Sequence, residues 1–397
     1  MILDSADIAG LSVLQLVHEN TAAATMFGID RMDRNSSLTV LFYNMGAMDT
    51  EVSLVRYSAI TEMPQNKSVE HIEVLSEAWD KNLGGADLDK IILNMIAERF
   101  NAQKERKGKP DVRENPKAIK RLVKEVSKLK DILSANKQVV VKLGELADYD
   151  SLNTIIERRE FEEAASGFFA RVAVPVEEAL KKAGLTLEDI EQVEILGGGI
   201  RVPKVQEILQ EKLGGKTLNV HLNGDEAMCF GSAFIASNSS ASFKVRKVLL
   251  TQHPISPISI HITPANVSRI AETNQETVTQ DADNQENSTE SASNGIQYDR
   301  TDQLYKIGDY LGQRKTLSLT YDTNLKIDVY SGEDSDGDHL ATFTVNGIDE
   351  IADSELLKKE NVTRPRVSLS FELSRTGILL LNKADAKVEE TYYVDAP

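Results

Sequence analysis

The sequence is poor in cysteine, in long apolar runs and in positive charge. Its single cysteine, Cys229, excludes an internal disulfide and a metal site built from several cysteines. No run approaches the roughly 18 apolar residues that a membrane-spanning helix needs. The 45 basic residues are outnumbered by 62 acidic ones, which gives a formal net charge of −17. This balance argues against a nucleic-acid surface and against docking on anionic lipid, because both need a basic patch.

The composition divides the 397 residues into three parts. Residues 1–240 alternate short apolar runs with helical periodicity, which predicts an α/β domain. Residues 264–297 contain six acids, one Arg, no Lys and no aromatic residue, so we expect a disordered acidic insert there. Residues 304–393 show short runs of period two between turn residues. This pattern predicts an all-β domain. A further strand expected at 257–262 indicates that this domain begins before the insert.

Hydrophobic periodicity also predicts individual elements. A buried strand is predicted at 38–43 with a hairpin partner at 51–57, and a further strand is expected at 192–196. Four helices are expected, at 87–100, 119–133, 158–182 and 203–213. The strands expected in the β domain are 257–262, 316–320, 325–329, 366–371 and 377–381.

Two glycine-rich turns are the strongest local signals of a ligand site. Residues 195–199 end an apolar strand in three glycines, and Pro203 begins the next helix. Glycine lets the backbone approach a flat or anionic ligand closely, and Arg201 is placed to lie over a base or pair with a phosphate. A second glycine pair, in Leu83-Gly84-Gly85, precedes another helix. Taken alone, such a turn is as often a tight connection as a ligand site.

Motifs for other chemistry are incomplete. Gly215-Lys216-Thr217 resembles the end of a P-loop, but Gln210 stands where the first glycine is required. Residues 332–343 resemble a calcium loop, but Gly and Phe occupy the positions of its first and last ligands. The six histidines show no metal-ligand spacing, so we expect no resident protein metal site. The basic residues between 104 and 128 are interpreted as a solvated helix face.

Six separated motifs occur in an order and spacing that point to one family. They are Glu19 to Ala24 with Gly28, the turn at Gly46, Leu83-Gly84-Gly85, Lys130 with Leu133-Ser134, Gly197 to Pro203, and Asp225-Glu226-Ala227 with Gly231. Together they resemble the nucleotide-binding domain of the 70-kDa heat-shock chaperone family. They are most similar to its large lumenal branch, the hypoxia up-regulated (170-kDa glucose-regulated) chaperones. The resemblance covers 1–263 well and 304–393 loosely.

This resemblance implies an actin-like α/β nucleotide-binding domain, incomplete in this chain, followed by an all-β substrate-binding sandwich. The implied segments are the end of the first lobe at 1–32, the second lobe at 33–240, an interdomain linker at 241–256 and the sandwich at 257–397. The family's two lobes close on ATP or ADP with Mg²⁺. Its first phosphate hairpin, its catalytic lysine and its helical lid are expected to have no counterpart in this sequence.

The resemblance also implies roles for particular residues. Glu19 matches a carboxylate of the catalytic centre. The residues implied to bind the nucleotide are Gly46, Gly84 and Gly85 toward the phosphates, Lys130, Ser134, Gly197, Gly198 and Arg201 around adenosine, and Asp225. Several positions depart from the family, namely Asn44, Ala47, Met48 and Asp49 in the phosphate loop and Ser127, Asp131 and Gly199 near adenosine. Asn44 replaces a carboxylate, and Asp49 places a negative charge where phosphate is expected. We therefore expect nucleotide binding with doubtful hydrolysis.

Two functions remain in competition. The first is an ATP-binding chaperone that assists unfolded client proteins in the endoplasmic reticulum lumen under stress. The second is a non-hydrolysing holdase and nucleotide-exchange partner of the lumenal 70-kDa chaperone. Glycosylation sequons at Asn35, Asn66, Asn238, Asn266, Asn287 and Asn361 suit that compartment. A sugar kinase of the same two-lobed superfamily is disfavoured by the β-rich carboxyl third.

Overall fold

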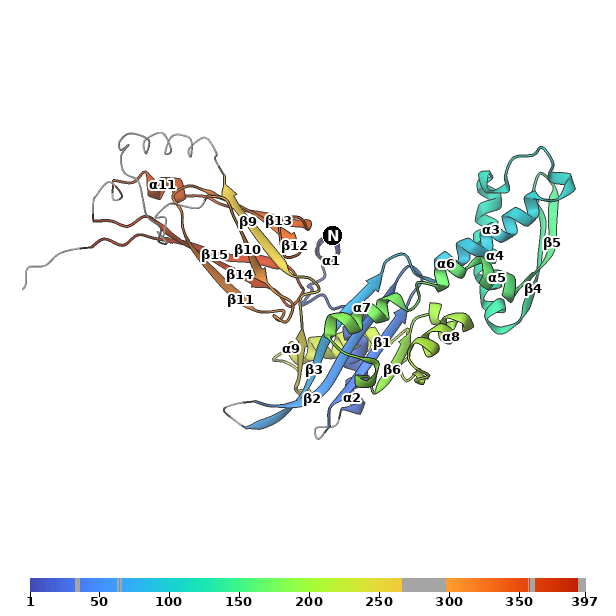
Figure 1. Ribbon diagram of the computed structural model, residues 1–397, viewed down its shortest axis with the longest axis horizontal. Helices are drawn as coiled ribbons and strands as arrows, with labels where there is room; N and C mark the ends of the chain where they lie inside the picture. Colours follow the sequence, from blue (N-terminus) through green and yellow to red (C-terminus); the bar gives the residue numbers. More distant parts are fainter. Residues whose placement is uncertain are drawn as a thin grey trace, which may run out of the picture. The chain divides into compact units, whose positions relative to one another are not determined.

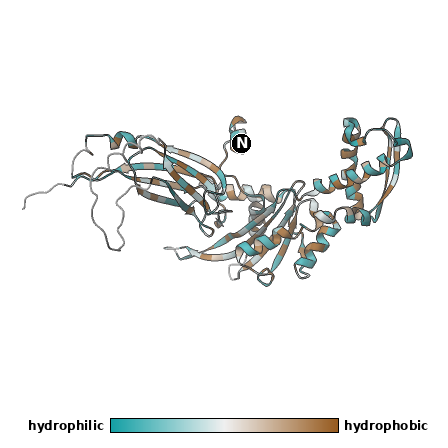
Figure 2. Cartoon of the chain, turned by 45° about the horizontal axis from the view of Figure 1, so that its top comes forward, coloured by the Kyte–Doolittle hydropathy of each residue, from teal (hydrophilic) through white to brown (hydrophobic). Residues whose placement is uncertain are grey.

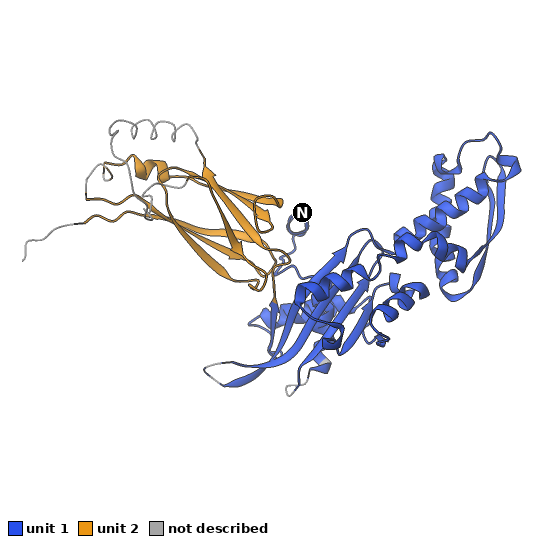
Figure 3. Ribbon diagram, viewed as in Figure 1, with its two compact units in different colours: residues 1–251 blue, residues 252–397 orange. Residues whose placement is uncertain are grey.

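The protein divides into two compact units, Met1–Thr251 and Gln252–Pro397 (Figure 3). In this computed structural model, the structure describes residues 1–32, 36–62, 64, 66–265, 298–355, 357 and 361–391. The first unit combines helices with a mixed sheet, which confirms the predicted α/β class. The second unit is built mainly of antiparallel strands.

The first unit contains most of the described helices. They are α1 (Ile2–Ile8), α2 (Glu19–Arg31), α3 (Gly85–Asn101), α4 (Pro116–Ala135), α5 (Arg158–Ala164), α6 (Ser166–Phe169), α7 (Val174–Ala183), α8 (Pro203–Lys212) and α9 (Ala227–Ser239). Short 3-10 helices are η1 (Lys104–Arg106), η2 (Val112–Glu114), η3 (Leu187–Asp189) and η4 (Gly199–Arg201). Its strands are β1 (Leu38–Met45), β2 (Thr50–Glu62), β3 (Lys67–Asp80), β4 (Gln138–Ala147), β5 (Asp150–Glu157), β6 (Gln192–Leu196), β7 (Leu218–Asn219) and β8 (Val248–Gln252).

A six-stranded sheet with the order β7-β6-β1-β2-β3-β8 forms the centre of this unit (Figure 1). Because successive side chains of a strand point to opposite faces, β1 contributes residues to two hydrophobic cores, one on each face of the sheet. Val40 and Phe42 pack with Phe27 of α2, whereas Leu41 and Tyr43 pack in the core that includes α7 and α8. The predicted hairpin of β1 with β2 and the predicted strand at 192–196 are both confirmed.

Helices α3 and α4 and the β4–β5 hairpin pack together as a separate lobe of the same unit, beyond one end of the six-stranded sheet (Figure 1). The predicted amphipathic helix is confirmed as α4, but its buried stripe is narrower than expected. The stripe consists of Ala118, Leu122, Val126, Leu129 and Leu133. Val123 and Ile132 were expected on it, yet they are 57% and 41% exposed. At about 100° per residue they fall on either side of the stripe, outside the contact with α3 and β4.

The helix expected over 158–182 is divided into α5, α6 and α7, so that prediction is wrong in its continuity. Pro175 lies in the first turn of α7. A proline there has no N–H to continue a preceding helix, although it is well suited to begin a new one. The break leaves the Val172 carbonyl free to accept a hydrogen bond from the Tyr43 hydroxyl at 3.0 Å.

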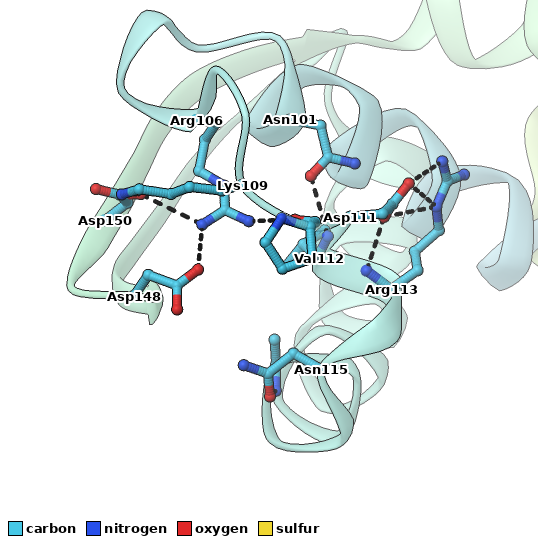
Figure 4. Close-up of polar contacts among 11 residues, drawn as sticks. Asn101, Arg106, Lys109, Asp111, Val112, Arg113, Asn115, Asp148 and Asp150 are labelled. Atoms are coloured by element: carbon cyan, nitrogen blue, oxygen red, sulfur yellow. Dashed lines mark hydrogen bonds and ion pairs between the residues drawn. The ribbon is translucent and has the colours of Figure 1, made fainter.

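A buried arginine joins the loop after α3 to the tip of the β4–β5 hairpin (Figure 4). The Arg106 side chain is 2% exposed and lies 2.5 Å from the Asp148 carboxylate and 3.4 Å from that of Asp150. It also donates to the Pro110 carbonyl at 2.6 Å and lies over the Phe100 ring at 4.8 Å. A buried charge needs such partners, so Arg106 ties together segments more than 40 residues apart.

The second unit contains two antiparallel sheets around one core. Its elements are β9 (Ile258–Pro264), β10 (Arg300–Tyr305), β11 (Arg314–Thr320), β12 (Leu325–Ser331), β13 (Asp338–Val345), α11 (Ile348–Ala352), β14 (Arg366–Leu373) and β15 (Leu379–Lys387). One sheet has the order β10-β9-β12-β13 and the other β11-β14-β15. Their apolar and polar residues alternate (Figure 2), and Ile260, Ile327 and Leu369 are among those in the shared core.

Two predicted segments overlap with strands. Pro264, expected in the acidic insert, pairs with Leu325, and the Ala265 N–H donates to the Asn324 carbonyl at 2.7 Å. The remainder of that insert, 266–297, lies outside the described residues. Part of the segment expected as an interdomain linker, 241–256, forms β8 at the edge of the six-stranded sheet beside β3.

We predict that Arg106→Met lowers the thermal midpoint of the first unit by about 4 °C or more, because Asp150 loses a partner and the loop loses its anchor. The matched control is Arg113→Met. Arg113 pairs with Asp111 in the same loop at 2.7 Å, but its side chain is 39% exposed. The control is expected to shift the midpoint by less than about 1 °C, since exposed pairs contribute little. Equal shifts in differential scanning calorimetry would contradict the assigned role of Arg106.

Candidate functional site

The candidate site lies where two parallel strands of the central sheet end. Strands β1 and β6 pair in parallel, with Asn44 opposite Leu196. Gly46 and Gly197 follow these strand ends directly. The carboxyl ends of neighbouring parallel strands are the common location of ligand sites in α/β proteins.

The glycine turn before α3 packs directly on the turn after β1. The Gly85 N–H donates to the Gly46 carbonyl at 3.0 Å, and the Ala86 N–H donates to the Ala47 carbonyl at 2.8 Å. A Cβ on Gly84 would overlap the backbone of Ala47. Gly84 is therefore required by this close approach of two backbones.

The third turn, after β6, contacts both others, and its three glycines differ from one another. A Cβ on Gly197, whose φ is +84°, or on Gly199 would overlap Met45. A Cβ on Gly85 would lie 4.0 Å from the Gly199 Cα, so the three turns meet. A Cβ on Gly198 would have no atom within 4 Å, and its φ is −73°. Within the described part of the chain, neither packing nor backbone angle requires a glycine at this position.

Lys130, on α4, connects that helix to these turns and to α3. Its Nζ donates to the Gly85 carbonyl at 2.8 Å and pairs with Asp89 of α3 at 2.8 Å. One turn later in α4, the Ser134 hydroxyl donates to the Lys130 carbonyl at 2.9 Å. Arg201 lies in η4, where its N–H donates to the Gly198 carbonyl at 3.2 Å and its side chain is exposed.

Glu19 and Asn44 meet beside the Gly46 turn. Glu19 is the first residue of α2, and the Asn44 amide donates to its carboxylate at 3.4 Å. An aspartate in place of Asn44 would repel Glu19, whereas the amide can donate to it. The departure noted in the sequence thus replaces a carboxylate pair by a neutral donor beside a carboxylate.

Two further carboxyl groups adjoin this pair, and both have raised pKa values. Glu51 lies directly opposite Asn44 on β2. Burial raises the pKa of Glu51 to about 7, and the negative charges of Glu19, Asp49 and Glu77 add to the shift. Burial likewise raises the pKa of Glu77, against the opposing effects of His18 and of a hydrogen bond from Thr21. Near neutral pH the cluster therefore carries less negative charge than its carboxyl groups suggest.

The loop that carries Asp225 lies against the third turn. A Cβ on Gly224 would lie 3.5 Å from the Gly197 nitrogen, and the Asp225 N–H donates to the Asn223 side chain at 3.1 Å. Helix α9 follows this loop and packs on α2 so closely that a Cβ on Gly231 would overlap the Ala22 carbonyl. The loop is thus connected to Gly197 on one side and, through α9, to the helix that begins with Glu19.

The structure brings most of the implied residues to one edge of the sheet. Gly85 contacts Gly46 and Lys130 directly, while Gly84 packs on Ala47 and Gly197 on Met45. Glu19 is joined through Asn44 and Asp225 through Gly224. Ser134 and Arg201 make local contacts, with Lys130 and with Gly198 respectively.

Sequence reasoning missed Glu51 and Glu77. Each lies in a strand that contains other polar residues, so the local pattern did not distinguish them.

Two other classes of site have no candidate among the described residues. No group of three or more His, Cys, Asp or Glu side chains there is arranged to hold a metal ion. None of the helices that the structure describes is long and apolar enough to cross a membrane.

Comparison with known proteins adds independent information. The sequence model of the Hsp70 protein family matches residues 1–300. Heat shock 70 kDa protein 17 of Arabidopsis thaliana is 32% identical over 403 residues, covering 100% of this chain and 43% of that protein. Hypoxia up-regulated protein 1 of Xenopus laevis is 29% identical, covering 98% of this chain and 58% of that protein. The human protein of the same name is 34% identical over 264 residues, covering 66% of this chain and 26% of its own length. The chain thus spans about half the length of the first two relatives.

We predict that Glu51 makes stability fall as pH rises from about 4.5 to 7. In that interval folded Glu51 keeps a proton that the unfolded chain releases, so the free energy of unfolding decreases with rising pH. Glu51→Gln removes this titration. The midpoint of the variant, relative to that of the wild type, should therefore be higher at pH 8 than at pH 5.

Thermal melts at both pH values measure this difference, and Glu98→Gln, on the exposed side of α3, is the control. If the difference in thermal midpoint between Glu51→Gln and the wild type is the same at pH 5 and pH 8, then Glu51 titrates alike in the folded and unfolded states.

Proposed function

This chain belongs to the Hsp70 protein family, and from that premise we propose that the edge where β1 and β6 end binds ATP or ADP. The family match bears out the resemblance predicted from the sequence. We further propose that the first unit is part of an actin-like nucleotide-binding domain and that the whole protein acts as a chaperone for unfolded clients.

The observation that carries this proposal is the contrast among the three glycines after β6. Gly197 and Gly199 are explained by their contact with Met45. Gly198 has open space beside it, between two glycines whose backbones touch the other turns. An open, side-chain-free backbone beside a cluster of loops is what close approach by a ligand requires.

The other implied residues take roles that fit their contacts. Gly46, Gly84 and Gly85 shape the backbone toward the phosphates, although the Gly85 N–H is already bonded to Gly46. Lys130 and Ser134, together with the exposed Arg201, would line the adenosine side, and Asp225 would close it from the loop before α9. The carboxylate oxygens of Glu19 suit Mg²⁺ that arrives with the phosphates and keeps most of its waters. Mg²⁺ would supply charge neutralisation at the phosphates.

A second candidate, binding without hydrolysis, is favoured by the bond between Asn44 and Glu19. The Glu19 carboxylate accepts from an amide that also lies opposite a Glu51 with a raised pKa. Fewer ionised carboxylates remain to orient a cation and an attacking water. In this second function the protein would be a holdase and a nucleotide-exchange partner of the lumenal 70-kDa chaperone.

For the second unit we propose a β-sandwich that holds extended client segments. Two antiparallel sheets around a shared core provide the framework, with strands such as β12 buried on one face and polar on the other. The relatives named hypoxia up-regulated protein 1 support a place in this branch of the family. We propose the endoplasmic reticulum lumen as the compartment.

The described sequons differ in how readily they would carry a glycan. Asn66 is exposed at the turn between β2 and β3, with a φ of +50°. The Asn238 amide instead donates to the Val248 carbonyl, which ties α9 to β8. The Asn361 amide donates to the Thr391 carbonyl at 2.9 Å. Asn66 is therefore the described sequon at which a glycan would displace least structure, and Asn35, Asn266 and Asn287 lie outside the described residues.

We predict that Gly198→Val weakens ADP binding at least about tenfold, or roughly 1.4 kcal/mol, with little change in the thermal midpoint without nucleotide. The added side chain meets open space in the protein and would occupy the space of the ligand. Calorimetric titration with ADP beside a melt of the same sample measures both quantities. Gly144→Val is the matched control, since a Cβ there also meets nothing within 4 Å, on the β4–β5 hairpin. Unchanged ADP affinity in Gly198→Val would remove this turn from the site.

We predict that this chain shows no steady-state ATP turnover above a buffer blank, because its phosphate turn has Asn44 in place of a carboxylate and Asp49 as a negative charge. Missing preorganised groups at a transferring phosphate cost several kcal/mol of transition-state stabilisation. Phosphate release by purified protein is the measurement. Turnover that copurifies with the chain and disappears in Glu19→Gln would contradict the prediction and favour the hydrolysing chaperone.

A further inference from the structure

A buried carboxylate on β6 makes contacts that the proposed nucleotide contacts do not account for. Glu194 is 1% exposed and lies two residues before Leu196, the last residue of the strand. Its neighbours Val193 and Ile195 belong to the core beneath the sheet, so Glu194 points to the other face, toward α2. A buried ionisable side chain in a strand is costly unless several donors satisfy it.

Glu194 accepts three hydrogen bonds from one short segment. Its Oε1 accepts from the N–H groups of His221 at 2.5 Å and Leu222 at 2.9 Å. Its Oε2 lies 2.9 Å from the His221 Nδ1. Strand β7 pairs with β6 over only two residues. Beyond the end of β7, the Glu194 side chain holds the backbone of the segment that follows.

The segment held by Glu194 leads directly to the candidate site. Leu222 is 7% exposed and packs in the core with Phe27 of α2. Two residues later, Gly224 lies against the Gly197 nitrogen. Asp225 follows, and α9 then packs on α2. Glu194 therefore sets the position at which this loop meets the turn after β6.

We propose that Glu194 is a positioning residue for the nucleotide site, holding the 221–225 loop against the Gly197 turn so that Asp225 and Gly198 face the same ligand. This inference rests on the proposed nucleotide function. Glu194 itself lies beneath the loop and does not touch the ligand.

A carboxylate suits this position better than an apolar side chain. The two adjacent N–H groups point to one place, and a carboxylate oxygen can accept both because it has two lone pairs and a negative charge. An apolar residue would leave buried N–H groups without an acceptor, and the loop would be released from the strand. A glutamine keeps one oxygen acceptor for the two N–H groups and adds a donor for the His221 ring.

The experiment compares Glu194→Met, Glu194→Gln and wild type in two measurements. The first is hydrogen exchange of the amides of 221–226 without nucleotide, and the second is ADP affinity by calorimetric titration. In Glu194→Met we expect faster exchange of these amides and at least about tenfold weaker ADP binding. Glu194→Gln should restore affinity to within about threefold of the wild type.

Two controls separate positioning from general stability. Ser76→Ala removes another buried hydrogen bond of the same sheet, from Ser76 to the Ala179 carbonyl of α7 at 2.7 Å. It should lower the thermal midpoint without changing ADP affinity. His221→Ala removes the imidazole with its contacts to Glu194 and to the Phe27 ring, and it keeps both backbone bonds to Glu194. Its ADP affinity should therefore stay within about threefold of the wild type.

The outcomes distinguish this inference from the function on which it rests. Unchanged exchange of 221–226 in Glu194→Met, or faster exchange with unchanged ADP affinity, would overturn the positioning role alone. Affinity lost equally in Glu194→Met and Ser76→Ala would reduce Glu194 to a stabilising residue and overturn the role as well. A wild-type protein that binds no ADP would overturn the proposed function, and the inference with it.

Discussion

Because β1 and β6 run parallel and end at Met45 and Leu196, the turns that follow them must share one small space beside the sheet. Within that space Gly197 and Gly199 touch Met45, and Gly84 touches Ala47. Any side chain at these three positions would separate the turns, and Lys130 would lose its position over Gly85. Lys130 and the loop of Asp225 reach the site through these turns, so their positions depend on this close contact.

Several carboxyl groups lie at the edge of the sheet where β1 ends, and their protonation sets the charge there. The acidic chain places Glu19 and Glu77 near Glu51, and burial raises the pKa values of Glu51 and Glu77. At Glu51 repulsion from the neighbouring carboxylates adds to the shift in pKa. Asn44 donates to Glu19 within the same group. These features lower the negative charge near the turn that we propose to bind phosphate, and they also reduce the number of ionised groups that phosphoryl transfer would use.

Buried polar side chains connect parts of the first unit that are remote in sequence. Arg106 joins the loop after α3 to Asp148 and Asp150, and Glu194 joins β6 to the loop before α9. In each case one side chain satisfies several backbone or charged partners, which a buried polar group requires. Such contacts specify which loops meet, whereas the apolar clusters on the two faces of the sheet provide most of the driving force for folding.

The sequence by itself determined the elements whose signal is local. Periodicity predicted β1, β6, α3 and α4, and glycine and proline marked the turn before α8, because strand alternation and helix spacing are properties of a short segment. It also carried the family motifs, which the match over residues 1–300 confirmed. Pro175, which marks the beginning of a separate helix within 158–182, was visible in the sequence, and its meaning was still missed.

Only the tertiary structure decided which of these segments meet. The different reasons for Gly197, Gly198 and Gly199 depend on the position of Met45, more than 150 residues away. The raised pKa of Glu51 depends on burial and on Glu19 and Glu77 from other elements. The role of Glu194 depends on a loop that arrives 27 residues later. Close approach, desolvation and hydrogen bonding between distant segments are properties of the folded chain, so no local pattern could have specified them.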